Sequence, residues 1–432
     1  MQCRGYDNNF YCVTYSFFIH RLQKIVNNQL NGECRLVQFV NFNLSRHPGL
    51  TTPAMKKFIR AIVAIIVVII VSFSAYAFIS GRTYLFEAVW YNFADIDDYQ
   101  KFSNNTVVTG EPQPWALSID YNKNPLPVEL KKMLEDLETI AVLAIKNDSI
   151  LYEYYWDGYS DSSLSGSFSM AKSITGLLVG AAVKEGKIQS LEEPVGNYLP
   201  EFRTGEKAKV RIIDLLTMSS GSNWDESYAN PFSVTTELYY GHNAYKVATG
   251  VSIIHSPGTL HVYKSGDTQL LGLIVEKATG KSLSAYASEK LWQTMGAEHA
   301  ALWSTDQIGG SEKAYCCFNS NARDFARLGK LMLDSGRWKG YDVIPIDYYK
   351  QSIKPCMIPD ETGKPCKYYG YQWWITPSHP DIFYARGILG QYVIVIPSKK
   401  TVIVRLGKKR SGERKDNAPA EVDALIQWGL RL

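Results

Sequence analysis

FSMAKSITGLLVGAAV, residues 168–183, is the stretch of sequence that decides how this chain folds around its chemistry. From Met170 to about Val183 the residues are small or apolar, and this pattern predicts a helix made for burial. Lys172 is the only charged residue in the stretch. Lysine is almost never buried unless it is paired or has a function. The alternative is a lysine at a helix end whose amine reaches solvent.

Ser169 lies three residues before Lys172, and residues three apart share one face of a helix. The hydroxyl and the amine can therefore meet. A serine in the first turn also lies near backbone N–H groups that favour a developing oxyanion. An amine acts as a base when burial penalises its charged form. The pair predicts a nucleophile, Ser169, with its base, Lys172.

Tyr263-Lys264-Ser265 is the second candidate element. It follows a Ser-Pro-Gly turn at residues 256–258 and precedes a helical pattern at residues 268–278. A tyrosine near a lysine ammonium loses its proton more easily and can relay it. We therefore include Tyr263 and Ser265 among the candidate site residues, with a packing role for the tyrosine as the alternative.

The third element is Ala385-Arg386-Gly387, which begins a glycine-containing run that ends at Gln391 between two late strands. Glycine in a strand often marks a close backbone approach to a ligand, although a simple hairpin turn is an equal alternative. The chain has no Gly-x-Ser-x-Gly motif, which argues against an α/β-hydrolase.

Strand patterns occur at both ends of the region 138–432, and helical patterns occupy the middle. Residues 140–146 and 149–155 flank a two-residue polar turn and predict a hairpin. Late strands are expected at 370–376, 382–386, 391–397 and 401–406, before a final helix at 418–430. Strands this close pair antiparallel. The predicted fold class is α+β, an antiparallel sheet flanked by helices with an adjoining all-helical lobe.

The N-terminal part divides into three segments. Residues 1–54 are expected to be a poorly ordered extension, with Met55 as an alternative start. In residues 55–81 an uncharged stretch from residue 61 follows Lys56, Lys57 and Arg60. It predicts a membrane anchor with the later residues exported. A signal peptide cleaved after residues 75–77 and a buried core helix are the alternatives. Residues 82–137 form a poorly periodic lead-in.

Composition and residue spacing limit the kinds of partner that we expect this chain to bind. The net charge is +4 and no dense basic stripe occurs, so we expect no nucleic-acid partner. The histidines and cysteines lack zinc-site spacing, so we expect no metal and no cofactor. Export would permit a Cys356–Cys366 disulfide, whereas adjacent Cys316 and Cys317 are expected simply to pack. The sequence does not define an oligomeric state.

The order and spacing of these motifs resemble the serine β-lactamase and penicillin-binding superfamily, over about residues 135–430. The chain looks most similar to the class C-like branch with esterases and 6-aminohexanoate-dimer hydrolases. The resemblance rests on Ser169-x-x-Lys172, Tyr263-x-Ser265 and Gly387-x-x-Gly390-Gln391. Residues 215–221, 257–258, 322–329 and 369–374 support it.

The resemblance implies a role for each residue and the same α+β fold. Ser169 would be the nucleophile, Lys172 would activate it, and Tyr263 would shuttle protons. Ser265 stands where many relatives have Asn and would complete the hydrogen-bond network. The backbone N–H groups of Ser169 and Ile388 would form the oxyanion hole.

One departure from the family pattern bears on the substrate. Relatives that act on β-lactams or peptidoglycan usually have Lys-Thr-Gly or His-x-Gly where this chain has Ala385-Arg386-Gly387. Arg386 is the candidate replacement for the missing cation, but successive strand side chains point to opposite faces, which argues against its reaching the substrate. This favours a small-molecule ester or amide substrate. A β-lactamase or DD-peptidase, and a non-catalytic membrane-tethered binding module, are the alternatives.

Overall fold

The computed structural model describes residues 53–432, and the described chain divides into two units at Gly81 and Arg82. Apart from its last two residues, the expected extension 1–54 lies outside the described residues. The first unit contains helix α3, Pro53–Ile79. The second unit, which starts at Arg82, contains the whole of the predicted β-sheet region.

Helix α3 is apolar and nearly all of its side chains are exposed. The most apolar 18-residue window within Lys57–Ile79 has a mean hydropathy of 2.9, and only 6% of that window is buried. This exposure argues against the buried core helix. The length and composition suit either a membrane span or a signal sequence, because about 20 apolar residues cross a bilayer.

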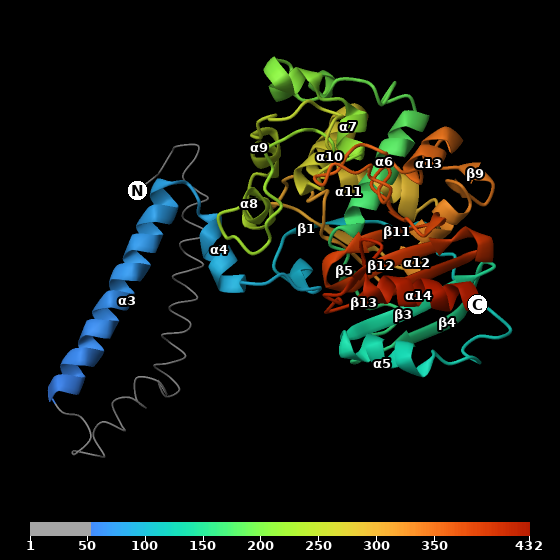
Figure 1. Cartoon of the computed structure of the whole chain (residues 1–432), viewed down its shortest axis with the longest axis horizontal. Helices are drawn as coiled ribbons and strands as arrows, with labels where there is room; N and C mark the ends of the chain where they lie inside the picture. The colour runs from blue at the N-terminus through green and yellow to red at the C-terminus, as the bar shows by residue number, and fades with distance from the viewer. Residues whose placement is uncertain (1–52) are drawn as a thin grey trace. The chain divides into compact units, whose positions relative to one another are not determined.

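The second unit is built on a seven-stranded sheet in the order β10-β11-β12-β13-β3-β4-β2 (Figure 1). Every neighbouring pair is antiparallel except β2 and β4. The strands are β2 Ala116–Leu117, β3 Thr139–Lys146, β4 Ser149–Tyr155, β10 Trp374–Thr376, β11 His379–Gly387, β12 Gln391–Ile396 and β13 Thr401–Gly407. Strands from both ends of the unit meet where β13 pairs with β3. The predicted α+β class is confirmed.

The sheet separates two hydrophobic cores, because strand side chains alternate between its faces. In β3, Leu143 and Ile145 belong to one core, whereas Val142 and Ala144 belong to the other. Helices α6, Met170–Lys184, and α12, Ala322–Leu333, cover the first face. Helices α5, Val128–Asp136, and α14, Ala420–Arg431, cover the second. Burial on both faces explains why the strands are almost continuously apolar.

The predicted hairpin forms as expected. Asn147 and Asp148 connect β3 to β4 with φ of 46° and 65°. Two consecutive left-handed residues match the right-handed twist of the strands that they join.

The segment between β4 and β10, where an all-helical lobe was predicted, holds most of the helices, but three of its strands form a second sheet with a strand that precedes β3. Its helices include α7 Ile212–Leu216, α8 Val234–Tyr240, α9 Ala244–Thr249, α10 Ser265–Thr279, α11 Leu283–Ala287 and α13 Ile346–Ser352. The second sheet has the order β1-β6-β7-β5, with β1 Asn104–Val107, β5 Ser165–Gly166, β6 Ala301–Ser304 and β7 Phe318–Ser320. Two-stranded pairs are β8 Arg337–Trp338 with β9 Tyr341–Asp342, and β14 Arg414–Lys415 with β15 Ala418–Pro419.

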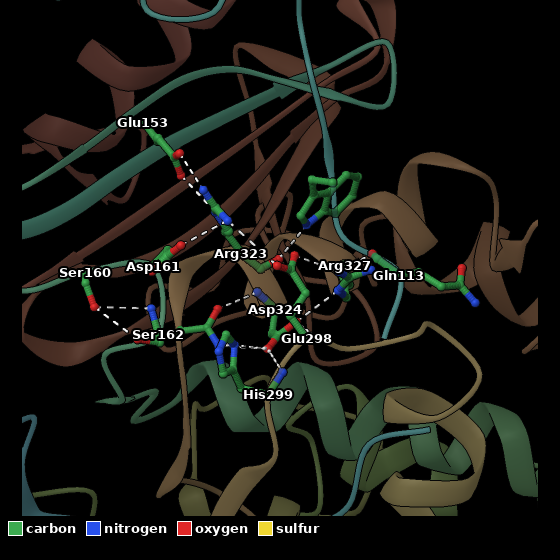
Figure 2. Close-up of polar contacts among 12 residues, drawn as sticks. Gln113, Glu153, Ser160, Asp161, Ser162, Glu298, His299, Arg323, Asp324 and Arg327 are labelled. Atoms are coloured by element: carbon green, nitrogen blue, oxygen red, sulfur yellow. Dashed lines mark hydrogen bonds and ion pairs between the residues drawn. The ribbon is translucent and has the colours of Figure 1, made fainter. Parts of the chain in front are cut away.

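A polar network fixes the start of α12 (Figure 2). Fully buried Asp324 accepts hydrogen bonds from the backbone N–H groups of Glu298 and His299 and from Arg327 Nε. Arg323 pairs with Glu153 of β4 at 2.7 Å and with Asp161 at 3.1 Å. The network joins the large sheet to the segment that leads into Ser169.

Several details differ from the sequence predictions. Residues 82–137 contain α4 Tyr84–Tyr91, β1, β2 and α5, where no regular element was predicted. Strand β10 is shorter than expected, because Gln372 has a φ of 62° and a turn occupies the start of the range.

The cysteine expectations are reversed. Cys316 and Cys317 form a disulfide, whereas Cys356 and Cys366 are free thiols. Cys317 lies at a turn with a φ of 66°, which the sequence pattern alone did not reveal.

Candidate active site

Ser169 is the N-cap residue of α6, and its side chain makes no capping hydrogen bond. The preceding residue, Phe168, has a φ of 44°, a conformation that costs energy for a residue with a side chain. Ser169 itself is half-buried. The turn therefore presents a hydroxyl that solvent and substrate can reach.

Lys172 lies one turn below Ser169 and is 1% exposed, so the solvent-reaching alternative is wrong. Its Nζ lies 3.0 Å from Ser169 Oγ, 3.0 Å from Ser265 Oγ and 3.1 Å from the carbonyl oxygen of Tyr315. The structure thus brings together three of the side chains predicted from sequence and adds one backbone group from a distant segment.

The chemistry of these partners orients the amine. The Tyr315 carbonyl can only accept a hydrogen bond, so Lys172 donates to it. Ser265 Oγ donates its own proton to Glu226 Oε1 over 2.6 Å, and Ser265 Oγ therefore accepts from Lys172. A neutral amine has two N–H groups, and both are committed. The third contact of the amine is with Ser169 Oγ, so the lone pair of the neutral form is available to accept the Ser169 proton.

Burial allows the neutral form of the Lys172 amine to be populated near physiological pH. Desolvation lowers the pKa of Lys172 to about 8, and the negative charge of Glu226 acts in the opposite direction. The amine is therefore about half neutral at pH 8. An exposed lysine would be almost fully charged at that pH.

Tyr263 packs against Tyr369 and Trp374, with ring centroids 5.9 and 5.3 Å away. Its hydroxyl hydrogen-bonds the Ser169 side chain. Burial and the charge of Glu226 raise the pKa of Tyr263 above its usual value. The expectation that a nearby lysine lowers this pKa is wrong, because burial has the largest effect. Lys264 donates to the Ser222 carbonyl, and Lys172 Nζ lies 5.0 Å from the Tyr263 ring centroid. Tyr263 is a proton donor at neutral pH.

Glu226 is a residue of this site that the sequence analysis missed. Its carboxylate accepts hydrogen bonds from the Ser265 backbone N–H at 2.7 Å, from Ser265 Oγ and from Trp224 Nε1 at 2.9 Å. It comes from the loop before α8, and no motif in that loop distinguishes it. Only the fold brings this carboxylate to the start of α10.

Gly387 ends β11 in close contact with the chain that leads into Ser169. A Cβ atom at Gly387 would lie 2.2 Å from the Ser167 carbonyl oxygen and 3.2 Å from Phe168 Cβ. Only glycine permits this approach. Ile388 follows directly, and Leu389 then turns with a φ of 61°. The two backbone segments expected to form the oxyanion hole therefore lie against each other.

Arg386 is held by groups other than Ser169. Its guanidinium lies 3.3 Å from the centroid of the Trp374 ring, and Nη1 donates to the Asn417 carbonyl at 2.9 Å. Trp374 packs in turn against Tyr263. The Trp374 ring therefore lies in contact with both the Arg386 guanidinium and Tyr263.

The comparison with known protein families agrees with this geometry. Residues 130–427 match the Beta-lactamase family. The chain belongs to this family. The match covers more than half of the chain and includes every predicted site residue.

Similar proteins are hydrolases of this family. The chain is 28% identical over 314 residues to the 6-aminohexanoate-dimer hydrolase of Paenarthrobacter ureafaciens, covering 68% of this chain and 79% of that protein. It is 27% identical over 218 residues to an Escherichia coli K12 protein assigned as a D-alanyl-D-alanine carboxypeptidase, covering 43% of this chain and 48% of that protein. The match therefore spans about half of the carboxypeptidase relative.

The fold matches solved structures of the same type. A protein assigned as a 6-aminohexanoate-dimer hydrolase, from Bacillus anthracis, superposes with a TM-score of 0.61 at 23% identity. The superposition covers 77% of this chain and 91% of that one. This likeness confirms the predicted β-lactamase-type fold.

Replacing Gly387 by alanine should separate β11 from the Ser169 turn, because a Cβ atom has no room beside the Ser167 carbonyl. We expect kcat on an ester substrate to fall by roughly 10²- to 10³-fold, the cost of losing one oxyanion-hole donor. Gly412→Ala is the matched control, since a Cβ atom at that position meets nothing within 4 Å. Unchanged kcat in Gly387→Ala, with intact circular dichroism, would contradict the close-approach role.

Replacing Glu226 by glutamine should lower the pKa of Lys172 further, because the negative charge of Glu226 favours the ammonium form. Activity requires the neutral amine, so kcat/KM rises with pH through this pKa. The midpoint should lie near pH 8 in the wild type and at lower pH in the variant. Asp225→Asn, a change at the exposed neighbour, should leave the midpoint unchanged. A midpoint that moves up or stays fixed in Glu226→Gln would refute the electrostatic role.

Proposed function

We propose that this protein is a serine hydrolase that forms an acyl-enzyme on Ser169 and acts on carboxylic esters or small amides. The observation that carries the proposal is the buried Lys172 amine, 3.0 Å from Ser169 Oγ and also hydrogen-bonded to Ser265 Oγ and the Tyr315 carbonyl. A merely structural lysine would not need to be buried beside an accessible hydroxyl. The family assignment supports hydrolysis as the class of reaction.

Acylation follows from the positions of the side chains. Ser169 Oγ attacks the substrate carbonyl carbon while its proton passes to Lys172 Nζ. The backbone N–H groups of Ser169 and Ile388 stabilise the oxyanion. As the tetrahedral intermediate collapses, the bond to the alcohol or amine breaks, and the leaving group takes a proton from Tyr263. The resulting phenolate recovers a proton from the Lys172 ammonium, which becomes neutral again.

Deacylation reverses these proton movements. Tyr263 passes its proton to the neutral Lys172 amine, and the resulting phenolate takes a proton from water as the water oxygen bonds to the acyl carbon. The bond to Ser169 Oγ then breaks, the serine takes the proton of the Lys172 ammonium, and a carboxylic acid leaves. The high pKa of Tyr263 makes its phenolate a strong base, so the tyrosine is protonated before each cycle.

The surroundings of Arg386 favour substrates that do not need a cation close to the nucleophile. The guanidinium stacks on the Trp374 ring and one of its N–H groups donates to the Asn417 carbonyl, so part of its binding capacity is used within the protein. The 6-aminohexanoate-dimer hydrolase relative, whose name denotes a linear amide substrate, supports the amide part of the proposal.

A β-lactamase or DD-peptidase activity is the second candidate. The family assignment and the relative assigned as a D-alanyl-D-alanine carboxypeptidase favour it. A non-catalytic membrane-tethered module of the same fold is the third. The spacing of Ser169, Lys172 and Tyr263 speaks against it, because a binding module does not require an activated nucleophile.

We further propose that α3 holds the catalytic unit at a membrane on the extracytoplasmic side. The helix is exposed and apolar, and Lys56, Lys57 and Arg60 precede its uncharged stretch. Positive residues favour the cytoplasmic side, which would place the later residues outside the cytoplasm. Cleavage after residues 75–77, with release of the catalytic unit, is the alternative.

Incubating the wild type with nitrophenyl esters, small linear amides and a chromogenic cephalosporin should give an acyl adduct with the first two classes. Intact-protein mass spectrometry detects the adduct. Ser169→Ala removes the nucleophile, so it should gain no mass and lose roughly 10³-fold or more in hydrolysis.

The outcomes separate the three candidates. Faster turnover of the cephalosporin than of any ester would favour the β-lactamase reading. If neither these compounds nor a fluorophosphonate probe forms an adduct, the protein is the non-catalytic binding module. An identical adduct on Ser169→Ala would show that another residue is the nucleophile.

A further inference from the structure

His261, Cys356 and Cys366 form a cluster that the proposed reaction does not use. Their potential ligand atoms all lie within 4.8 Å of one another. His261 and Cys366 are buried, and Cys356 is half-buried, so one side of the cluster is open to solvent. Among residues 53–432 no other group of three such side chains converges in this way.

The backbone builds the cluster from two segments. Cys356 and Cys366 lie side by side because the loop between them folds back, with the Met357 N–H donating to the Cys366 carbonyl and the Cys366 N–H donating to the Ile358 carbonyl. The His261 N–H donates to the Pro359 carbonyl at 2.8 Å. The imidazole is thereby held over the two sulfur atoms.

The hydrogen bonding of His261 fixes its tautomer. Nδ1 lies 2.9 Å from the Thr217 carbonyl oxygen, which can only accept, so Nδ1 carries the proton. Nε2 therefore keeps its lone pair on the side of the cysteines, where the ring hydrogen-bonds the Cys356 side chain. A ring N–H that donates to a backbone carbonyl, with the other nitrogen available, is the arrangement that metal-binding histidines usually have.

A disulfide explains this cluster less well. Cys316 and Cys317 are bonded in this structure, whereas Cys356 and Cys366 are adjacent and remain thiols. A disulfide would also give no role to a buried imidazole with a fixed tautomer. Two sulfur atoms and one imidazole nitrogen are the ligands that Zn²⁺ and related ions prefer.

We propose that His261, Cys356 and Cys366 bind a borderline-to-soft metal ion such as Zn²⁺, with solvent in a fourth position. No sequence pattern indicates this site, because the three ligands have no metal-site spacing and only the fold assembles them. The ion would join the loop at 356–366 to the segment that carries Tyr263. It would thus fix one wall of the active site without taking part in catalysis.

The test uses the full-length chain, purified in detergent without oxidation, with Zn²⁺ and Co²⁺ as probes. All samples carry serine at Cys3, Cys12 and Cys34, so that residues 1–52 contribute no thiol. We expect one Zn²⁺ per chain and a higher melting temperature with Zn²⁺. Co²⁺ should give an intense thiolate-to-metal absorption band. His261→Ala should weaken binding by at least about tenfold, and Cys356→Ser with Cys366→Ser should abolish it.

His255→Ala is the matched histidine control, because His255 is exposed and outside the cluster. It should bind Zn²⁺ as the parent does. If a variant fails to fold, X-ray absorption at the zinc edge still tests the proposal in the protein with the cluster unsubstituted. We expect two sulfur ligands and one imidazole ligand. The proposal is overturned if Cys356 and Cys366 are recovered as a disulfide without metal, or if Zn²⁺ binds equally well to His261→Ala.

Discussion

The active site depends on the buried amine of Lys172, whose hydrogen-bond partners within the protein are already in place before substrate binds. Lys172 donates to the Tyr315 carbonyl and to Ser265 Oγ, and Glu226 fixes the direction of the second bond by accepting the Ser265 proton. The lone pair of the amine is left to Ser169. Burial inside an apolar helix makes the neutral amine accessible, because desolvation penalises its charge. The composition of α6 is therefore part of the chemistry.

The large sheet is what brings this arrangement into contact with its oxyanion hole. Strands from the two ends of the catalytic unit pair at β13 and β3, and the alternation of their side chains builds a core on each face. Helix α6 packs on one face beside β11, so the glycine at the end of that strand meets the turn at Ser169. The polar network at the start of α12 links the sheet to the segment before Ser169, because Arg323 pairs with residues of both (Figure 2).

The features that sequence predicted are those with a local cause. The buried helix after Ser169, the hairpin at Asn147 and the antiparallel strands follow from periodicity and turn chemistry, and motif order identified Tyr263 and Ser265. The features that it missed arise from tertiary contact. Glu226 reaches Ser265, and the Tyr315 carbonyl reaches Lys172, from segments with no motif. Strand β1 pairs with β6, almost two hundred residues later. The cysteines show the same limit, because spacing favoured a bond that the fold does not make.

The most direct measurement is a titration of the Lys172 amine itself by NMR, in protein labelled at the lysine side chains. Lys172→Arg identifies the signal by its loss. A titration midpoint near pH 8, well below the ordinary lysine value of 10.5, is the predicted result. A Lys172 signal that titrates at or above 10.5 would mean that the amine is held as an ammonium ion, and Ser169 would then have no base.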